Sequence, residues 1–211
     1  MAANAESLAR PAVALCRRAA LPYAPAMGHI PDDSALMLRY KDGDMAAFET
    51  LYRRHNDPLY RYLLRLCRHR DTAEDIFQDV WSKIVKARGS YRPTAKFTTF
   101  LYRVARNCFI DHLRRNKRHA NTAEFDAELH SHPGEQPEMS TERSLAKERL
   151  SRALMTLPEE QRDAFLLHEE AGLSVDQIAS VTGSNRETAK SRLRYAMQKL
   201  RAAIDEQAER L

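Results

Sequence analysis

The sequence predicts an all-α protein built from two helical domains that a flexible linker joins. Apolar residues recur at spacings of three and four through most of residues 34–204, and no stretch alternates like a β-strand for long. Glycine is scarce, with six in 211 residues. Residues 120–141, in contrast, have no sustained period and combine Pro133, Gly134 and Pro137 with acidic side chains, which is typical of a linker.

The domain boundaries follow from where the helical pattern begins and stops. Residues 1–30 are rich in Ala, Pro and Arg and are predicted to be a disordered extension, with Met27 as a candidate natural start. Residues 31–119 form the predicted first domain, and residues 142–211 form the second. With 211 residues, of which 43% are hydrophobic, the chain can bury one medium core or two small ones.

In the first domain, the predicted helices begin at side chains that can cap them. Ser34 is expected to cap the first helix and Asp44 the second, with a turn at Gly43 between them. A third helix is expected to continue the apolar stripe after Asp57-Pro58.

A fourth helix, over residues 72–87, is expected to begin at Asp71 and to carry a broad apolar stripe that includes Trp81. Acidic residues near its N-terminus, where the helix dipole favours them, form a flank made of Glu74, Asp75 and Asp79. This flank is either a solvated face or a docking surface for a basic partner helix.

Positive charge is concentrated in two further predicted helices. Six Lys and Arg side chains oppose only Asp111 in residues 98–118, and six oppose only Glu187 in residues 185–201. The whole chain has a formal charge of +5, so the remainder is net acidic. This layout suits a protein that grips a polyanion at two separated points.

The second domain is predicted to contain a helix over residues 159–170, after Pro158, and then a helix-turn-helix. Residues 174–177 read as a capping box that opens a short helix, and residues 184–187 read as a second capping box that opens the longer basic helix. Such a second helix can enter the major groove of DNA. An ordinary helical hairpin with a solvated basic face is the alternative.

The composition disfavours several other classes of protein. No apolar run approaches the roughly 20 residues of a membrane span. The three cysteines are scattered and lack CxxC spacing, which favours a reducing compartment over a disulfide framework.

Catalysis is a disfavoured alternative. The adjacent Asp111 and His112 would point about 100° apart on a helix, so they do not form a catalytic pair. His130 and His132 have no cysteine or carboxylate at zinc spacing. We therefore expect no catalytic residue, no metal site, no cofactor and no small-molecule substrate.

Three motifs, in this order, resemble the extracytoplasmic-function (ECF) group of bacterial RNA polymerase sigma factors. Residues 71–81 (DTAEDIFQDVW) are similar to the polymerase-docking helix of that family. Residues 97–115 (FTTFLYRVARNCFIDHLRR) resemble the helix that recognises and opens the −10 promoter element. Residues 157–162 (LPEEQR) and 172–201 resemble the −35-binding domain. The predicted domains would then be sigma regions 2 and 4.

The resemblance implies a role for each matching position. The polymerase clamp would be contacted by Asp75, Gln78, Asp79 and Trp81. The −10 DNA would be met by Asn107, Asp111, Arg114 and Arg115, while Lys96 and Thr98 would help to hold a base extruded from the non-template strand. The −35 major groove would be met by Ser184, Asn185, Arg186, Glu187, Lys190, Ser191 and Arg194.

Two positions depart from the family pattern. Phe100 stands where the family often has Trp, and we therefore assign it to the core without a strand-opening role. Ala189 stands where the family usually has Val, so the recognition helix makes a smaller contact with the helix before it.

The resemblance also implies partners and a compartment. Core RNA polymerase, promoter DNA and an anti-sigma factor are the expected partners, in the bacterial cytoplasm. A two-domain repressor or activator is the other alternative, but residues 34–118 lack the alternating βα pattern of a receiver domain. Co-purification with core polymerase would distinguish the two.

Overall fold

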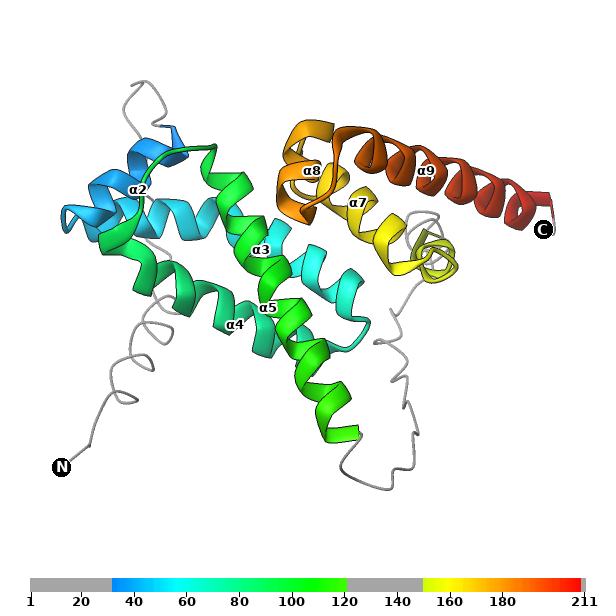
Figure 1. Ribbon diagram of the computed structural model, residues 1–211, viewed down its shortest axis with the longest axis horizontal. Helices are drawn as coiled ribbons and strands as arrows, with labels where there is room; N and C mark the ends of the chain where they lie inside the picture. The colour runs from blue at the N-terminus through cyan, green and yellow to red at the C-terminus, as the bar shows by residue number, and fades with distance from the viewer. Residues whose placement is uncertain (1–31, 121–149, 210–211) are drawn as a thin grey trace, which may run out of the picture.

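The computed structural model describes residues 32–120 and 150–209, and within them every regular element is helical, as predicted. The N-terminal bundle consists of α2 (Asp33–Lys41), α3 (Met45–Cys67), α4 (Arg70–Lys86), the short 3-10 helix η1 (Ala87–Ser90) and α5 (Phe97–Ala120) (Figure 1). The C-terminal bundle consists of helical residues 150–155, α7 (Glu159–Glu169), α8 (Val175–Thr182) and α9 (Arg186–Glu209). The predicted extension, 1–30, and all of the predicted linker after residue 120 lie outside the described residues.

The first two helices begin at aspartates. Asp44 caps α3 as predicted, because its Oδ1 accepts from the backbone N–H groups of Ala46 (3.0 Å) and Ala47 (3.2 Å). The prediction that Ser34 caps the first helix is wrong. Asp32 takes that place, with Oδ2 accepting from the N–H of Ser34 at 3.2 Å.

Helix α3 is continuous through Pro58, so the predicted break at that residue is also wrong. A proline inside a helix costs about 3 kcal/mol because it removes a hydrogen bond. The tertiary contacts offset this cost, since α3 is buried along one whole face at Ala47, Leu51, His55, Leu59, Tyr62, Leu63 and Leu66. Local sequence signals of this kind are routinely overridden by packing.

Helix α4 begins two residues earlier than its capping pattern suggested, so the prediction that Asp71 caps it is wrong. His69 occupies the N-cap without a side-chain hydrogen bond, and Asp71 lies in the first turn, where its charge still complements the helix dipole. The preceding residue, Arg68, ends α3 in the left-handed conformation at φ 67°.

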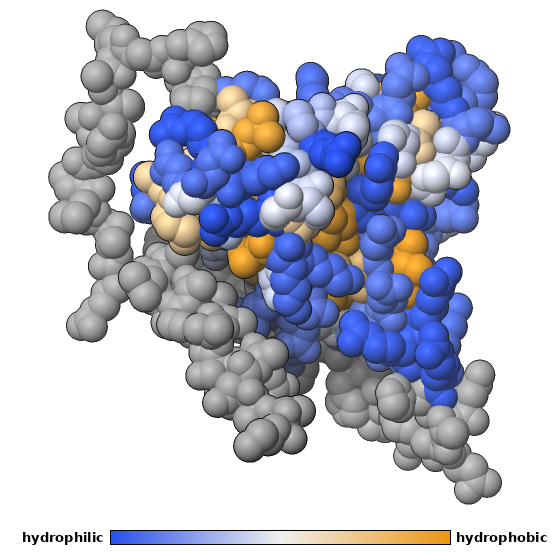
Figure 2. Space-filling view, turned by 60° about the vertical axis from the view of Figure 1, so that its left-hand side comes forward, coloured by the Kyte–Doolittle hydropathy of each residue, from blue (hydrophilic) through white to orange (hydrophobic). Residues whose placement is uncertain are grey.

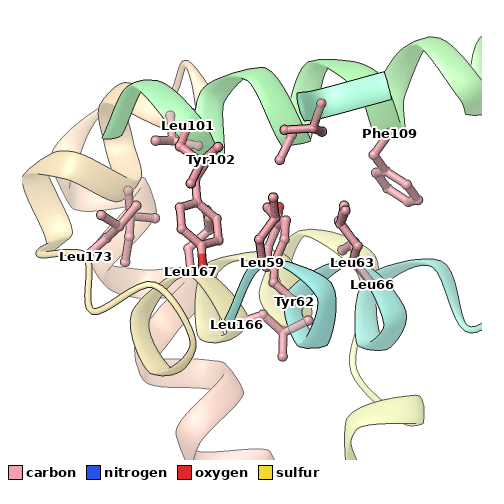
Figure 3. Close-up of a cluster of buried hydrophobic side chains, with 14 of the residues drawn as sticks. Leu59, Tyr62, Leu63, Leu66, Leu101, Tyr102, Phe109, Leu166, Leu167 and Leu173 are labelled. Atoms are coloured by element: carbon pink, nitrogen blue, oxygen red, sulfur yellow. The ribbon is translucent and has the colours of Figure 1, made fainter. Parts of the chain in front are cut away.

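One hydrophobic core extends from the N-terminal bundle into the C-terminal one. Helix α3 contacts α7, and α5 contacts α8. Tyr62 of α3 and Tyr102 of α5 meet edge to face, with ring centroids 5.2 Å apart. Leucines of both bundles surround these rings in Figure 3, including Leu59, Leu63, Leu66, Leu101, Leu166, Leu167 and Leu173.

The face of the molecule that Figure 2 shows is mostly polar. Figure 2 shows a predominantly hydrophilic face on which hydrophobic residues form only small patches. Among the described helices, none is both long and apolar enough to cross a membrane.

A polar cluster joins α2 to the middle of α3. Asp33 Oδ2 lies 2.8 Å from His55 Nε2, and Asp33 Oδ1 accepts from Arg54 at 2.7 Å. The hydrogen bond with His55 lowers the pKa of the Asp33 carboxyl; burial opposes this effect and Arg54 adds to it.

We expect Asp33→Asn to lower the free energy of unfolding by about 1–2 kcal/mol at pH 7. Because the pKa is lower in the folded state, the contribution is present above the unfolded pKa and disappears as the pH falls through the folded pKa. Urea unfolding followed by circular dichroism at pH 7 and pH 3 should therefore show that the difference in free energy of unfolding between Asp33→Asn and wild type is smaller at pH 3. Asp42→Asn, at an exposed turn, serves as the control; an equal loss at both pH values for Asp33→Asn would contradict this account.

Candidate nucleic-acid interface

The helix-turn-helix predicted from the sequence is formed by α8 and α9. Ser174 and Gln177 make the predicted capping box: the Gln177 N–H donates to Ser174 Oγ (3.4 Å), and the Ser174 N–H donates to Gln177 Oε1 (2.9 Å). Gly183 ends α8 with φ 67°, a conformation in which a side chain would be strained. Helix α8 is therefore defined at both of its ends by local chemistry.

The second capping box is not formed as predicted. Asn185 caps α9, because its Oδ1 accepts from the N–H of Thr188 at 2.7 Å. Ser184 instead pairs its hydroxyl with that of Thr182, at 2.9 Å. The asparagine is one residue further along the chain than the expected serine, which brings its carbonyl oxygen within reach of the N3 position.

The recognition helix buries one face and exposes the other. Ala189, Leu193, Ala196 and Leu200 are at most 7% exposed, and they lie on the face that packs against the rest of the domain. Arg186, Glu187, Lys190 and Arg194 are exposed, while Ser191 is half-buried and donates to the Glu187 carbonyl at 2.8 Å. The predicted −35 residues therefore lie together on an accessible surface, where cations can meet phosphates and base edges.

Two of these arginines already have neighbours. Arg186 Nε lies 2.8 Å from Oδ1 of Asp176, which belongs to the facing helix α8, and both side chains are exposed. The guanidinium of Arg194 lies 5.0 Å from the centroid of the Tyr195 ring. Both contacts orient long side chains outward without burying them.

The predicted −10 residues fall into two separate groups. Asn107, Asp111, Arg114 and Arg115 are exposed along the second half of α5. Lys96 and Thr98 lie at the other end of the helix, where they line a hollow of about 260 Å³. Residues of the C-terminal bundle line the same hollow, namely Ala171, Gly172 and Gln177.

The α5 group lies next to the acidic flank of α4. Arg115 lies 3.8 Å from Asp79, and Lys83 lies 3.7 Å from Asp111. These four side chains line a hollow of about 390 Å³ together with Arg114 and Arg118. A predicted polymerase contact, Asp79, is thus a direct neighbour of a predicted DNA contact, Arg115.

Trp81 is buried, unlike the other predicted polymerase contacts. Asp75, Gln78 and Asp79 are exposed on α4, but Trp81 is only 5% exposed. Its ring packs against Tyr52 (centroids 4.8 Å apart), Phe48 (5.9 Å) and Phe77 (6.4 Å). A side chain so enclosed supports the α4 surface from beneath, and its contact with polymerase stays a prediction.

His112 has a polar neighbour on its own helix. His112 Nε2 lies 2.9 Å from the Asn116 amide, one turn further along α5. Burial, and then the nearby Arg115, lower the pKa of His112. Within residues 32–120 and 150–209, no group of three His, Cys, Asp or Glu side chains could hold a metal ion.

No pattern in the sequence predicted a polar contact between the two bundles. In the sequence, Arg103 and Arg106 are two of the six cations in residues 98–118. In the structure, Arg106 Nε donates to Asp163 Oδ2 (2.8 Å) and Arg103 donates to Ser180 Oγ (2.6 Å), both in the C-terminal bundle. The only available signal was their spacing of three, which places both on one side of α5.

The fold and this surface define a two-domain helical protein with a DNA-reading helix-turn-helix. Comparison with protein families matches Sigma-70 region 2 to residues 51–119 and Sigma-70 region 4 to residues 147–200. The chain belongs to the ECF RNA polymerase sigma factors, proteins of promoter-specific transcription initiation that act with core RNA polymerase and promoter DNA.

Relatives from distant bacteria support this assignment. The chain is 32% identical over 182 residues to ECF RNA polymerase sigma factor SigM of Mycobacterium tuberculosis, covering 84% of this chain and 89% of that protein. It is 31% identical to RNA polymerase sigma factor CarQ of Myxococcus xanthus, covering 81% and 96%. It is 29% identical to the ECF RNA polymerase sigma-E factor of Escherichia coli, covering 85% and 95%.

Solved structures share the fold. CnrH in complex with the cytosolic domain of CnrY has a TM-score of 0.60 at 22% identity, over 82% of this chain and 97% of that one. The sigma factor RpoE in complex with the anti-sigma factor NepR from Bartonella quintana has a TM-score of 0.61 at 23% identity, over 75% and 96%.

The capping of α9 can be tested with neighbouring substitutions. We expect Asn185→Ala to lower the free energy of unfolding by about 1 kcal/mol, because it leaves the N–H of Thr188 without its acceptor. Ser184→Ala should cost less, since Ser184 does not cap the helix. Thermal unfolding of both variants would show this order, and a larger loss for Ser184→Ala would contradict the assignment of the cap.

Proposed function

We propose that this sigma factor recognises both a −10 and a −35 promoter element and helps to open the −10 strand. Residues 31–119 would serve as region 2, residues 142–211 as region 4, and residues 120–141 as a flexible linker that threads the polymerase. The observation that best supports this proposal is the exposed cationic face of α9, presented by a helix-turn-helix in a member of this family.

In this proposal, α9 enters the major groove of the −35 element. Arg186, Lys190 and Arg194 follow one another at intervals of four residues, so they share one side of the helix. Arginine pairs bidentately with guanine, and lysine adds salt-dependent attraction to phosphate. Ser184, Asn185, Glu187 and Ser191 lie beside them and complete the contact.

The N-terminal bundle would act on polymerase and on the −10 element. Asp75, Gln78 and Asp79 offer an acidic docking surface, with Trp81 beneath it. Asn107, Asp111, Arg114 and Arg115 would meet the DNA, and Lys96 and Thr98 would hold an extruded base. Unstacking a base step costs a few kcal/mol, and a base held in this way offsets part of that cost.

In this proposal the protein acts in the bacterial cytoplasm. It has no enzymatic activity of its own. An anti-sigma factor is its proposed regulator, since the similar folds include sigma factors solved with CnrY and NepR. In-vitro transcription with purified core enzyme and a promoter library tests the whole proposal, and the absence of factor-dependent transcripts would refute it.

Lys190→Ala is expected to weaken binding to a −35 duplex by about 1–3 kcal/mol, provided that Lys190 reads a base. Binding to core polymerase should not change, because Lys190 lies on the other bundle from the docking surface. Fluorescence anisotropy measures both affinities, one with the −35 duplex and one with core polymerase. Lys199→Ala, which removes the same charge further along α9, is the matched control, and an equal loss in both variants would reject a specific role for Lys190.

Asp79→Lys is expected to weaken binding to core polymerase at least tenfold while leaving −35 duplex binding unchanged, since a change of 1.4 kcal/mol corresponds to tenfold. Asp79 also lies near Arg115, so Arg115→Ala serves as a companion variant that removes this pair without altering the acidic surface. If Arg115→Ala weakened polymerase binding as much, the ion pair and not the docking surface would explain the effect.

A further inference from the structure

Two carboxylates flank the first arginine of the recognition helix. Arg186 Nε lies 2.8 Å from Oδ1 of Asp176 on α8, and Arg186 Nη1 lies 3.8 Å from Oε1 of Glu187, the next residue along α9. These three side chains, here called the Arg186 cluster, are all more than half exposed. Because an exposed ion pair adds little to the stability of a fold, folding alone does not explain this arrangement.

The Arg186 cluster differs in charge from the rest of the exposed face of α9. One guanidinium and two carboxylates give the cluster a formal charge of −1, whereas Lys190 and Arg194, about one and two turns further on, are cations. A group of side chains with a net negative charge does not attract the phosphates that dominate non-specific affinity for DNA. The surroundings of Arg186 therefore favour the reading of a base edge over the binding of phosphate.

Local chemistry fixes both helices where they carry this pair. Asp176 lies in the first turn of α8, which begins at the capping box of Ser174 and Gln177. Arg186 is the first residue of α9, which Asn185 caps. In helix-turn-helix proteins, the first residues of the recognition helix are the ones that contact base edges. Arg186 thus lies at the base-reading end of α9, and its partner comes from the other helix of the motif (Figure 1).

The position of the carboxylate suits the arginine to guanine. Guanine offers two acceptors in the major groove, O6 and N7, which an arginine meets with two N–H groups. The Nη atoms lie beyond Nε at the tip of the side chain, so a carboxylate beside Nε leaves them available, and the distance of 3.8 Å to Glu187 is too long for a hydrogen bond. Without Asp176, this flexible side chain would be free to turn to a phosphate, which every sequence offers.

We propose that Asp176 is a specificity-determining residue of −35 recognition, because it positions the guanidinium of Arg186 for one guanine and keeps it away from the phosphates. Asp176 acts through Arg186, which is the residue that touches the base. This inference rests on the proposed function, since it requires that α9 read the −35 duplex, and it adds a determinant that lies outside the recognition helix. A weaker hold on DNA of any sequence accompanies the gain in discrimination, because the carboxylates repel phosphate.

The test first measures sequence preference. The full chain, bound to core polymerase, is mixed with a promoter library in which the −35 element is randomised, and the bound DNA is sequenced. Arg186→Ala is expected to remove a preference for guanine at one position. Asp176→Asn removes the charge but keeps the size of the side chain. It is expected to lower the preference at that same position about tenfold and to leave the other positions unchanged.

Affinity for a duplex of unrelated sequence should change in the opposite direction. It is measured by fluorescence anisotropy with the full chain alone, because core polymerase itself binds DNA and the cationic face of α9 is exposed in the chain. Asp176→Asn frees Arg186 for a phosphate, so it should bind this duplex more tightly than wild type. The slope of log K against log salt should become steeper by about one. A purely structural role of Asp176 in α8 would instead weaken binding to every sequence.

Glu169→Gln is the matched control, because it removes the same charge at an exposed position of α7 outside the Arg186 cluster. It should leave the guanine preference and the salt slope unchanged. In a chain that already carries Arg186→Ala, Asp176→Asn should have no further effect on the sequence preference, since the two residues act as a pair.

Three results would overturn the inference. If Arg186→Ala removed the guanine preference and Asp176→Asn left it intact, Asp176 would have no part in recognition, and the proposed function would stand. If Asp176→Asn changed the preference at positions that Arg186→Ala leaves unchanged, its effect would not pass through Arg186. If wild-type holoenzyme showed no preference anywhere in the −35 element, the proposed function and this inference would fail together.

Discussion

Asp163 is nearly inaccessible to water, yet it carries a carboxyl group that two residues of the other bundle satisfy. Burial raises the pKa of this carboxyl, and the hydrogen bonds from Arg106 and Tyr62 oppose that effect. Because a buried charge without partners is costly, the position of α7 on α3 and α5 depends on keeping all three groups together. The relative placement of the bundles is thus controlled by one carboxylate as much as by the leucines around it.

Helix α5 is the element on which the other parts of the protein meet. Its first turns face the C-terminal bundle through Thr99, Arg103 and Arg106, and its later turns face α4 through Asp111 and Arg115. A helix of this length exposes several sides at once, and each side here has a different neighbour. The cations of this one basic stretch therefore contact different partners in the fold: Arg103 and Arg106 contact the C-terminal bundle, and Arg115 contacts α4.

The sequence predicted the parts of the structure that local chemistry determines. The all-helical class, the Asp44 cap, the capping box at Ser174 and the turn at Gly183 follow from side chains that lie close together along the chain. The break at Pro58 and the cap at Ser34 were wrong because packing of α3 and a competing aspartate decided them. The contact of Asp163 with Arg106 joins residues 57 positions apart, across a stretch without periodic pattern, so no local signal could reveal it. The individual DNA and polymerase contacts stay predictions, including that of Trp81, which is buried in the free chain.

The aromatic cluster under α4 has an optical consequence. Trp81 is the only tryptophan in the chain, and its indole Nε1 is buried without a hydrogen-bond partner among the described residues. Indole emission shifts in wavelength with the polarity around the ring and is quenched by nearby groups. The ring packs against Tyr52 on the helix that carries the acidic flank. The emission of this one tryptophan can therefore report a partner that binds α4, without a label.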